Sequence, residues 1–245
     1  KADFLGLLNK FDDLPILFIA DEVHNLGSEN IRDKLPENFS FRIGLTATPK
    51  RYFDETGTKS IYKYFGDPTP IDPPIDLKFA IENNYLCPYK YYPSIVYLSD
   101  DETYEYHKLT KEINKLRFYR DPDDEGLKLK YQLRVNILNN AINKISVFEE
   151  ILEKVGKLTK TLFYCSPDQI DLVSEILISK YGYHVNQITF HDRKNYNQII
   201  DNFSKGRTDA LCAIAVIDEG LDVPAAENAF FLSSSGNEKQ FIQRR

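Results

Sequence analysis

The sequence contains no methionine, although a chain of 245 residues normally holds several. This absence indicates either an internal segment of a longer chain or a sequence from which residues are missing. Only three cysteines occur, without a C-x-x-C pair, which argues against a disulfide framework and against a zinc site. We therefore expect a protein of the reducing cytoplasm.

Long apolar runs and a basic leader are also lacking. No stretch approaches the roughly 20 apolar residues that a transmembrane helix needs, and no signal peptide follows Lys1. The net charge of −6 argues against a polybasic nucleic-acid-binding protein but leaves room for a local binding groove. With 42% hydrophobic and 28% charged residues, the composition predicts a soluble globular protein with a substantial core.

Short apolar segments alternate with helical patterns in two parts of the chain. Residues 16–20 and 41–45 are typical of short strands buried on both faces. Further strands are expected within residues 159–165, 184–190 and 209–217. A helix is expected after the first of these, with Ser166 as its N-cap and Pro167 at its first position, and another over residues 194–206. This alternation predicts parallel sheets covered by helices.

Residues 100–155 instead carry apolar side chains at helical spacing, and one stripe comprises Leu133, Ile137, Leu138, Ile142 and Ile145. The sequence therefore predicts an α/β unit over residues 1–98, a helical arm over 99–156 and a second α/β unit over 157–245. The stripe most simply packs against one of the α/β units. The alternatives are an arm that tracks DNA and an arm that docks a partner.

Two adjacent carboxylates, Asp21 and Glu22, end the first predicted strand, in "ILFIADEVHNL". Ligands of open α/β sheets bind at the carboxyl ends of the strands, so a phosphate-bound Mg²⁺ is expected here. One carboxylate beside the ion and a second near the attacking water suit hydrolysis of a nucleoside triphosphate. The pair alone is weak evidence, because Asp21 could instead cap a following helix.

The motifs resemble those of the superfamily 2 helicases and translocases, of the DEAD/DEAH type. "DEVH" and "GLTATP" follow successive apolar strands. "KTLFYCSPDQIDLV" resembles the opening of the second motor domain, and "IDEGLDVPAAENAFFLSSSGNEKQFIQRR" resembles motifs V and VI. The four motifs occur in the family's order and leave only the arm uncovered. The spelling is most similar to the branch that contains restriction-type DNA translocases and DEVH-box DNA repair helicases.

The resemblance implies two RecA-like domains, the first truncated at its start and the second at its end. It implies an ATP hydrolase, with ATP and Mg²⁺ as cofactors, that acts as a DNA helicase or translocase within a restriction, defence or repair system. DNA would be held through its backbone, and nuclease or methyltransferase partners are expected. The alternatives are an RNA helicase and a helicase-like scaffold that binds nucleic acid without productive hydrolysis.

The resemblance also implies roles for the residues of the first two motifs. Asp21 would hold Mg²⁺, and Glu22 would polarise the hydrolytic water. His24 would couple the nucleotide to the second domain, unless it is an ordinary histidine with satisfied hydrogen bonds. Thr46 and Thr48 would link the state of ATP to the grip on DNA, and hydroxyls at a strand end also serve as turn residues.

Motifs V and VI would complete the nucleotide site. Gly220 and Asp222 would approach the ribose and the DNA backbone, with local capping as the alternative for Asp222, and Gln243 would open motif VI. The sequence contains no G-x-x-x-x-G-K-[ST] loop, and the arginine fingers are expected just past Arg245. The segment alone is therefore expected to hydrolyse ATP too slowly to be useful.

Candidate DNA contacts are spread over both α/β units. They comprise Thr48, Arg51, Ser166, Gln169, and Lys205 or Arg207, each with an ordinary surface role as its alternative. The tyrosines of residues 89–97 could stack on bases. Alternating tyrosines are more typical of a half-buried strand, which we expect here.

Overall fold

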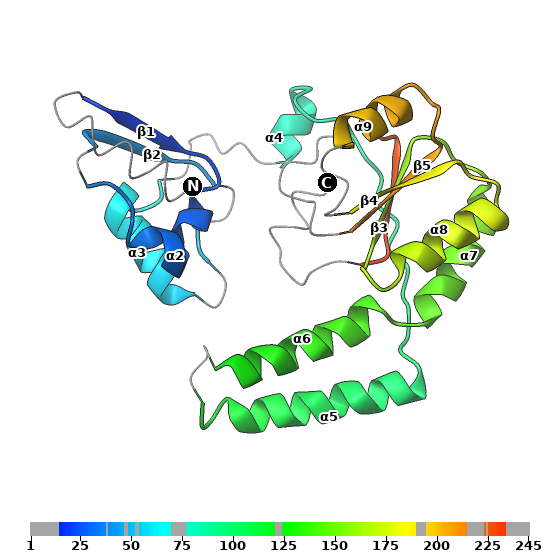
Figure 1. The fold of residues 1–245 in the computed structure, drawn as a ribbon, viewed down its shortest axis with the longest axis horizontal. Helices are drawn as coiled ribbons and strands as arrows, with labels where there is room; N and C mark the ends of the chain where they lie inside the picture. The colour runs from blue at the N-terminus through cyan, green and yellow to red at the C-terminus, as the bar shows by residue number, and fades with distance from the viewer. Residues whose placement is uncertain are drawn as a thin grey trace. The chain divides into compact units, whose positions relative to one another are not determined.

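The computed structural model describes residues 15–37, 39–46, 49–51, 54–69, 77–120, 124–189, 195–214, 223 and 225–233. The chain divides into two compact units, Lys1–Tyr92 and Pro93–Arg245, each with its own parallel sheet (Figure 1). The parallel α/β fold class predicted from the sequence is therefore confirmed. In the described part of the chain, no helix is both long and apolar enough to span a membrane.

The first unit contains a parallel pair of strands, β1 (Leu17–Ala20) and β2 (Phe41–Gly44). A 3-10 helix, η1 (Val23–Gly27), and a short helix, α2 (Glu29–Arg32), follow β1. The longer helix α3 (Glu55–Phe65) packs on the sheet, and α4 (Leu77–Glu82) follows it. The small core joins Ala20, Val23 and Ile61.

The predicted burial of both faces of these strands is wrong for the described residues. One face packs on α3, through Phe18 and Ala20. The other face carries Leu17 and Ile19, which are 51% and 56% exposed, beside Phe41 and Ile43 of the neighbouring strand. An apolar pattern predicts a strand that can be buried on both faces, but burial also requires other elements to pack on each face.

Helix α3, which the sequence interpretation did not include, has a clear local cause. Asp54 is its N-cap, and the Asp54 carboxylate accepts a hydrogen bond of 2.7 Å from the Gly57 backbone N–H. Gly57 also lies against Gly27 of η1, where an added Cβ would collide with the Gly27 carbonyl oxygen. The two glycines therefore let α3 approach the turn that follows β1.

The second unit has a four-stranded parallel sheet in the order β4-β5-β3-β6. The strands are β3 (Thr161–Cys165), β4 (Val185–Ile188), β5 (Ala210–Ile214) and β6 (Asn228–Phe231). Helices α7 (Asn143–Val155) and α8 (Ile170–Ser179) cover one face, and α9 (Tyr196–Ser204) covers the other. Strand β6 was not predicted as a separate element.

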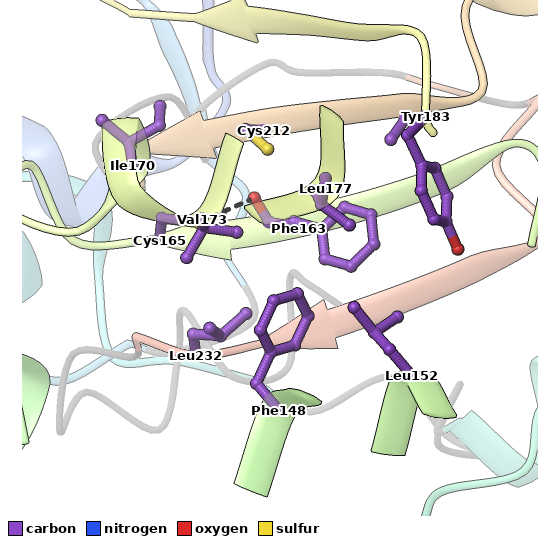
Figure 2. Close-up of a cluster of buried hydrophobic side chains, with 11 residues drawn as sticks. Phe148, Leu152, Phe163, Cys165, Ile170, Val173, Leu177, Tyr183, Cys212 and Leu232 are labelled. Carbon is purple, nitrogen blue, oxygen red and sulfur yellow. Dashed lines mark hydrogen bonds between the residues drawn. The ribbon is translucent and has the colours of Figure 1, made fainter. Parts of the chain in front are cut away.

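The main core lies between β3 and the helices α7 and α8 (Figure 2). Phe163 is 0% exposed and stacks on Phe230, with 5.0 Å between the ring centroids. Phe148 of α7 and Tyr183 meet the same ring edge-on. Helix α7 therefore contributes to this core, although the sequence pattern groups it with the arm.

The start of α8 differs from its prediction. The helix begins at Ile170 rather than at Pro167, and Ser166 is not a side-chain cap. Its hydroxyl instead donates to the amide oxygen of Asn140, a residue 26 positions earlier. Residues 167–169 form a turn, because the N–H groups of Gln169 and Ile170 both donate to the Ser166 carbonyl.

The predicted arm is a pair of long helices, α5 (Asp100–Leu116) and α6 (Glu125–Asn139), which lie side by side and antiparallel (Figure 1). We call these two helices and their connection the hairpin. The expectation that its apolar stripe is buried is wrong for most of the stripe. Ile145 packs on the core of the second sheet, whereas Leu133, Leu138 and Ile142 are exposed.

The tyrosine-rich segment before the hairpin has no regular secondary structure and belongs to no strand. Tyr89, Tyr91, Tyr92 and Tyr97 are all exposed. The half-buried strand expected here is therefore wrong, because alternation of tyrosines favours a sheet only where a neighbouring strand supplies the hydrogen bonds. The three cysteines are free, as expected.

Candidate active site

The acidic pair lies in a tight turn where β1 and β2 end together. The Leu45 N–H donates to the Ala20 carbonyl at 2.8 Å, and the Val23 N–H donates to the Leu45 carbonyl at 3.0 Å. These bonds place the turn after β1 beside the segment after β2. Glu22 has φ 49°, a left-handed conformation that costs a non-glycine residue free energy and is often found at functional sites.

His24 brings the two predicted motifs together. Its ring is buried, and Nδ1 lies 3.0 Å from the Thr46 hydroxyl oxygen and 3.2 Å from Glu22 Oε2. The hydroxyl donates to Nδ1 or accepts from it, depending on which ring nitrogen carries the proton. A carboxylate, an imidazole and a hydroxyl from two strand ends therefore form one contact chain, which we call the Glu22–His24–Thr46 chain.

Arg51 faces the interior of the first unit. Its Nε donates to Asp54 Oδ2 at 2.7 Å, and its Nη1 donates to the His24 carbonyl. Its backbone N–H donates to the Thr58 hydroxyl at 2.9 Å. Arg51 thus joins the His24 turn to the start of α3, and its predicted contact with DNA stays a prediction.

Asp54 is a member of this site that sequence reasoning missed. Burial by itself raises the pKa of the Asp54 carboxyl, but the Gly57 N–H and the Arg51 guanidinium outweigh it and leave that pKa below its ordinary value. The available signal was local, since Asp followed three residues later by Gly precedes a helical pattern. Its role as an anchor for Arg51 is a tertiary contact.

The donor set suits Mg²⁺ held together with a phosphate. Asp21 is exposed and uses Oδ1 to accept the Glu22 N–H at 2.8 Å, so the proposed role as a helix cap is not observed. Magnesium commonly binds one or two carboxylates and completes its shell with phosphate oxygens and water. Among the described residues, no group of three or more potential metal ligands gathers, so an all-protein metal cage is not seen there.

The second unit places two predicted DNA contacts at the carboxyl end of β3. Ser166 and Gln169 are both buried. Asn140 accepts from Ser166 and donates to Asp168 Oδ2 at 2.6 Å, so it ties this strand end to the base of the hairpin. The Gln169 Oε1 is buried without a hydrogen-bond partner. The contacts with DNA stay predictions, and Ser166 would have to release Asn140 to make one.

The other predicted residues divide into two groups. Lys205 pairs with Asp201 at 2.7 Å and Arg207 donates to Asn202 at 3.1 Å, and both basic side chains are exposed. The remaining predictions fall outside the described residues, namely Thr48, Gly220, Asp222 and Gln243.

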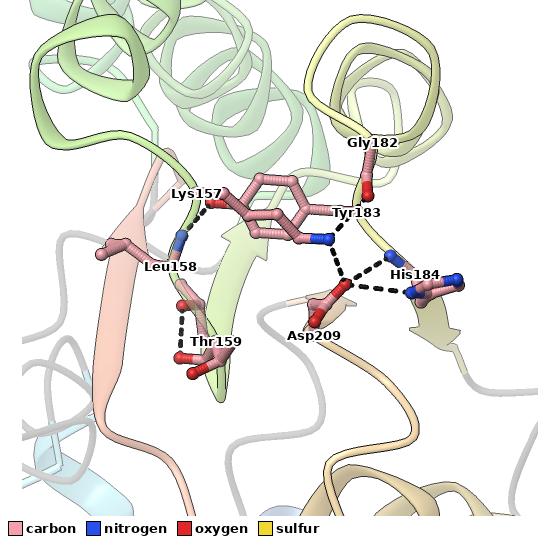
Figure 3. Close-up of polar contacts among 8 residues, drawn as sticks. Lys157, Leu158, Thr159, Gly182, Tyr183, His184 and Asp209 are labelled. Carbon is pink, nitrogen blue, oxygen red and sulfur yellow. Dashed lines mark hydrogen bonds and ion pairs between the residues drawn. The ribbon is translucent and has the colours of Figure 1, made fainter.

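A second polar cluster lies at the opposite, amino end of the second sheet (Figure 3). Asp209 Oδ2 accepts from the His184 backbone N–H at 2.9 Å and pairs with Lys157 Nζ at 2.9 Å. Burial alone raises the pKa of Asp209, but these partners outweigh it and lower that pKa. Lys157 also donates to the Gly182 carbonyl at 2.7 Å. The cluster therefore joins three segments: the one after α7, the one before β4 and the one before β5.

Replacement of Asp209 by Asn is expected to lower the free energy of unfolding by about 1 kcal/mol at neutral pH, because Lys157 is 41% exposed and solvent screens its charge. Since folding depresses the pKa, this stabilisation is present above the ordinary value of 3.8 and is lost as pH falls through the lower, folded value. Urea denaturation from pH 7 to pH 3 measures this stabilisation. Asp201→Asn, which removes an exposed carboxylate paired with Lys205, is the control. A difference that does not shrink below pH 4 would contradict the assignment.

Comparison with known proteins finds a family match for part of the chain. Residues 143–245 match the family described as the helicase conserved C-terminal domain. The match begins at the first residue of α7 and contains the whole second sheet. This part of the chain is therefore similar to helicase C-terminal domains.

One curated relative covers the whole chain. The DNA 3'-5' translocase XPB2 of Sulfurisphaera tokodaii is 29% identical over 266 residues, which include 100% of this chain and 56% of the relative. The chain thus spans about half the length of that relative.

Two solved structures are also similar at 15% identity. The Hef helicase domain of Pyrococcus furiosus gives a TM-score of 0.47, with 100% of this chain and 71% of that chain covered. The SWI2/SNF2 ATPase core of Sulfolobus solfataricus, solved in complex with dsDNA, gives a TM-score of 0.37, with 87% and 56% covered.

Proposed function

We propose that the chain is the central part of an ATP-dependent DNA translocase or helicase with two RecA-like domains. The observation that carries this proposal is the Glu22–His24–Thr46 chain, which connects the acidic pair after β1 with the hydroxyl after β2. The match of residues 143–245 to the helicase conserved C-terminal domain and the similarity to a relative named as a DNA 3'-5' translocase support it. ATP with Mg²⁺ is the cofactor that this arrangement serves.

In the proposed mechanism, each residue of the turn has one task. Asp21 holds Mg²⁺, which when bound neutralises charge on the phosphates of ATP. Glu22 orients the attacking water and accepts its proton. His24 and Thr46 pass a change at Glu22 to the segment after β2, because each lies within hydrogen-bond distance of the next. Loss of the γ-phosphate thereby alters the grip on DNA.

The rest of the nucleotide site belongs to the same proposal. Gly220, Asp222 and Gln243 would face the nucleotide from the second RecA-like domain, and Thr48 would extend the hydroxyl link after β2. A phosphate-binding loop and arginine fingers must complete the site, since the sequence contains no G-x-x-x-x-G-K-[ST] loop. The segment alone is therefore proposed to turn over ATP poorly.

The proposed biological setting depends on the residues found within the motifs. The DEVH box and the "SSSGNEKQFIQRR" ending resemble restriction-type translocases and DNA repair helicases. This favours a motor of a restriction, defence or repair system, with nuclease or methyltransferase partners and a cytoplasmic location. Sequence-independent contacts with the DNA backbone suit a motor that must move along any sequence.

Two other functions are kept as alternatives. A helicase-like scaffold without hydrolysis has no use for the built contact between Glu22 and His24, so the geometry disfavours it. An RNA helicase would use the same catalytic residues and differ only in its polymer. The polymer that stimulates hydrolysis therefore separates these functions.

Steady-state ATP hydrolysis by the full-length protein tests the proposal, measured with duplex DNA, single-stranded DNA, RNA and no polymer. We expect DNA to raise the rate well above the polymer-free rate, and RNA to raise it less. Stronger stimulation by RNA would replace the DNA motor with an RNA helicase. Hydrolysis that no polymer raises above background would favour the scaffold.

A further inference from the structure

One side of the second sheet ends in a strand that has a single neighbour within the described residues. Strand β4 comes first in the order β4-β5-β3-β6, so it pairs with β5 alone. Its four residues include no proline and no charged side chain, which are features that protect many edge strands from further pairing. We call the unpaired side of Val185–Ile188 the β4 edge.

The direction of the backbone groups along β4 follows from its pairing with β5. The His184 carbonyl accepts from the Ala210 N–H at 3.2 Å, so the backbone of His184 faces β5. Successive residues of a strand direct their N–H and C=O groups alternately to its two sides. Asn186 therefore also faces β5, whereas the backbone groups of Val185 and Gln187 point to the β4 edge.

An open hollow of about 460 Å³ adjoins the start of this edge, a size that suits part of a peptide or a small ligand. The hollow reaches both faces of the sheet. Val185 packs with the core under α8, whereas Ile188, on the same face as Asn186, packs with α9. The lining includes Ile178, His184, Val185, Asn186, Asn202 and Arg207. A strand laid along the β4 edge could therefore place a side chain in the hollow.

Arg207 gives the hollow a positive charge. Its side chain is exposed, and Nη1 donates to the neutral amide oxygen of Asn202 at 3.1 Å. Asp201 and Asp209, from the same part of the chain, are each paired with a lysine. Asp171 lies on the α8 side of β4 and is not a lining residue. Within the described residues Arg207 forms no ion pair, so the hollow complements a carboxylate.

The segment that enters β4 is held in place before any partner binds (Figure 3). Tyr183 is buried, and its hydroxyl oxygen accepts the Leu158 N–H at 2.8 Å. The next residue, His184, donates its N–H to Asp209 Oδ2 at 2.9 Å. A partner strand would therefore meet an edge that already has sheet geometry, which reduces the entropy lost on binding.

We propose that the β4 edge binds an extended, acidic segment of a partner protein, which adds a strand to the second sheet. Val185 and Gln187 exchange backbone hydrogen bonds with the segment, and Arg207 pairs with one of its carboxylates. Addition of a strand to an open edge is a recurring mode of peptide recognition, in which backbone hydrogen bonds supply affinity and side-chain pockets supply specificity. The interface goes beyond the proposed function and does not depend on ATP hydrolysis.

Two other occupants fit less well. A free anion could accept hydrogen bonds from Arg207, but it could not donate to the outward carbonyl groups of Val185 and Gln187. A second copy of β4 could supply those backbone groups, but its four residues carry no carboxylate for Arg207.

Val185→Pro tests the backbone contact directly. Proline lacks the outward N–H and is tolerated at the first residue of an edge strand, where the hydrogen bonds to β5 remain. Val185→Ala is the matched control, because it shortens the side chain and keeps the N–H. The probe is a fluorescein-labelled peptide of alternating threonine and valine with an aspartate at each end, so that either strand direction brings a carboxylate to Arg207.

Fluorescence anisotropy of this peptide, titrated with the full-length protein, measures the affinity. Val185→Pro is expected to weaken binding about tenfold, whereas Val185→Ala should stay near the unmodified protein. Thermal unfolding confirms that both variants are folded.

Arg207→Gln tests the charge. It is expected to weaken binding of the aspartate peptide about tenfold and to leave binding of the same peptide with asparagine unchanged. Lys205→Gln removes the same charge two residues away, outside the lining, and should have little effect.

Amide hydrogen exchange gives a readout that a purely ionic contact would not change. In the free protein the N–H groups of Val185 and Gln187 should exchange faster than that of Asn186, which is bonded to β5. The aspartate peptide is expected to slow exchange at Val185 and Gln187, and the peptide with N-methylated backbone nitrogens should not.

Four results would overturn the proposal. Equal binding by Val185→Pro and Val185→Ala, without slower exchange at the β4 edge, would leave only an ionic contact. Equal binding of the aspartate and asparagine peptides would remove Arg207 from the site. Slower exchange that depends on protein concentration without peptide would assign the edge to a second copy of the chain. No saturable binding at millimolar peptide would remove the interface. The proposed function would stand in each case, because ATP hydrolysis is measured separately.

Discussion

Replacement of Glu22 by Gln is expected to stop ATP turnover in the full-length protein while ATP binding continues. Glutamine keeps the size of the side chain but cannot accept a proton from water. Loss of a positioned general base typically lowers the rate by about 10²- to 10⁴-fold. Steady-state hydrolysis measures turnover, and titration with a fluorescent ATP analogue measures binding.

A matched control separates catalysis from a general loss of acidic charge. Glu29→Gln, on the exposed first turn of α2, removes the same charge from the same unit outside the Glu22–His24–Thr46 chain. Its turnover should equal that of the unmodified protein. Unchanged turnover in Glu22→Gln would remove Glu22 from the catalytic role, and with it the main support for the proposed mechanism.

Part of the site could be predicted because it depends on strand ends alone. An apolar run that stops at Asp21 and Glu22 predicts carboxylates at the edge of a sheet. A second run that stops before Thr46 predicts a hydroxyl at the same edge, since the strands are parallel. The structure places His24 in contact with both Glu22 and Thr46, while the catalytic roles of these residues stay predictions.

The direction of Arg51 could not be predicted in this way. Its position after the second strand places it near the site edge, where the sequence interpretation expected an outward side chain in contact with DNA. The structure directs it inward, because Asp54 and the His24 carbonyl together offer the guanidinium two acceptors. That choice depends on the approach of α3 to η1, which only the pairing of Gly27 with Gly57 permits.

Tertiary contacts also overrode a sound local rule at α8. Serine before proline is a common helix start, yet the Ser166 hydroxyl is bonded to Asn140 and the helix begins at Ile170. No local window contains both partners, since 26 residues separate them. Periodicity predicted α8 itself, as it did β3, β4, β5 and α9, but it missed α3 and β6. A contact between distant segments set the start of α8.

The same distinction between local pattern and tertiary cover explains the exposed surfaces. Strand β3 was expected to be buried, and all five of its residues are. Strand β1 has a similar apolar run, yet Leu17 and Ile19 are exposed, because helices cover both faces of the second sheet but α3 covers only one face of the first. A pattern therefore indicates which face can be buried, while neighbouring elements decide whether it is.

Replacement of Phe163 by Ala is expected to cost the second unit about 4 kcal/mol of unfolding free energy. Phe163 is completely buried, and its ring contacts Phe148 and Tyr183 (Figure 2). It also stacks on Phe230. Its removal leaves a cavity between β3 and α7, at the centre of a core of buried hydrophobic side chains. Chemical denaturation followed by circular dichroism measures the loss.

Phe231 is the matched control, because it lies on the neighbouring strand β6 and stacks on Tyr164, with 5.0 Å between the ring centroids. It is partly exposed, so Phe231→Ala should cost only about 1 kcal/mol. Equal losses for the two variants would show that the core is not centred on Phe163. Because Ser166 directly follows β3, a centre at Phe163 also means that this strand end is supported by a packed ring from within the strand as well as by the hydrogen bond of Ser166 to Asn140.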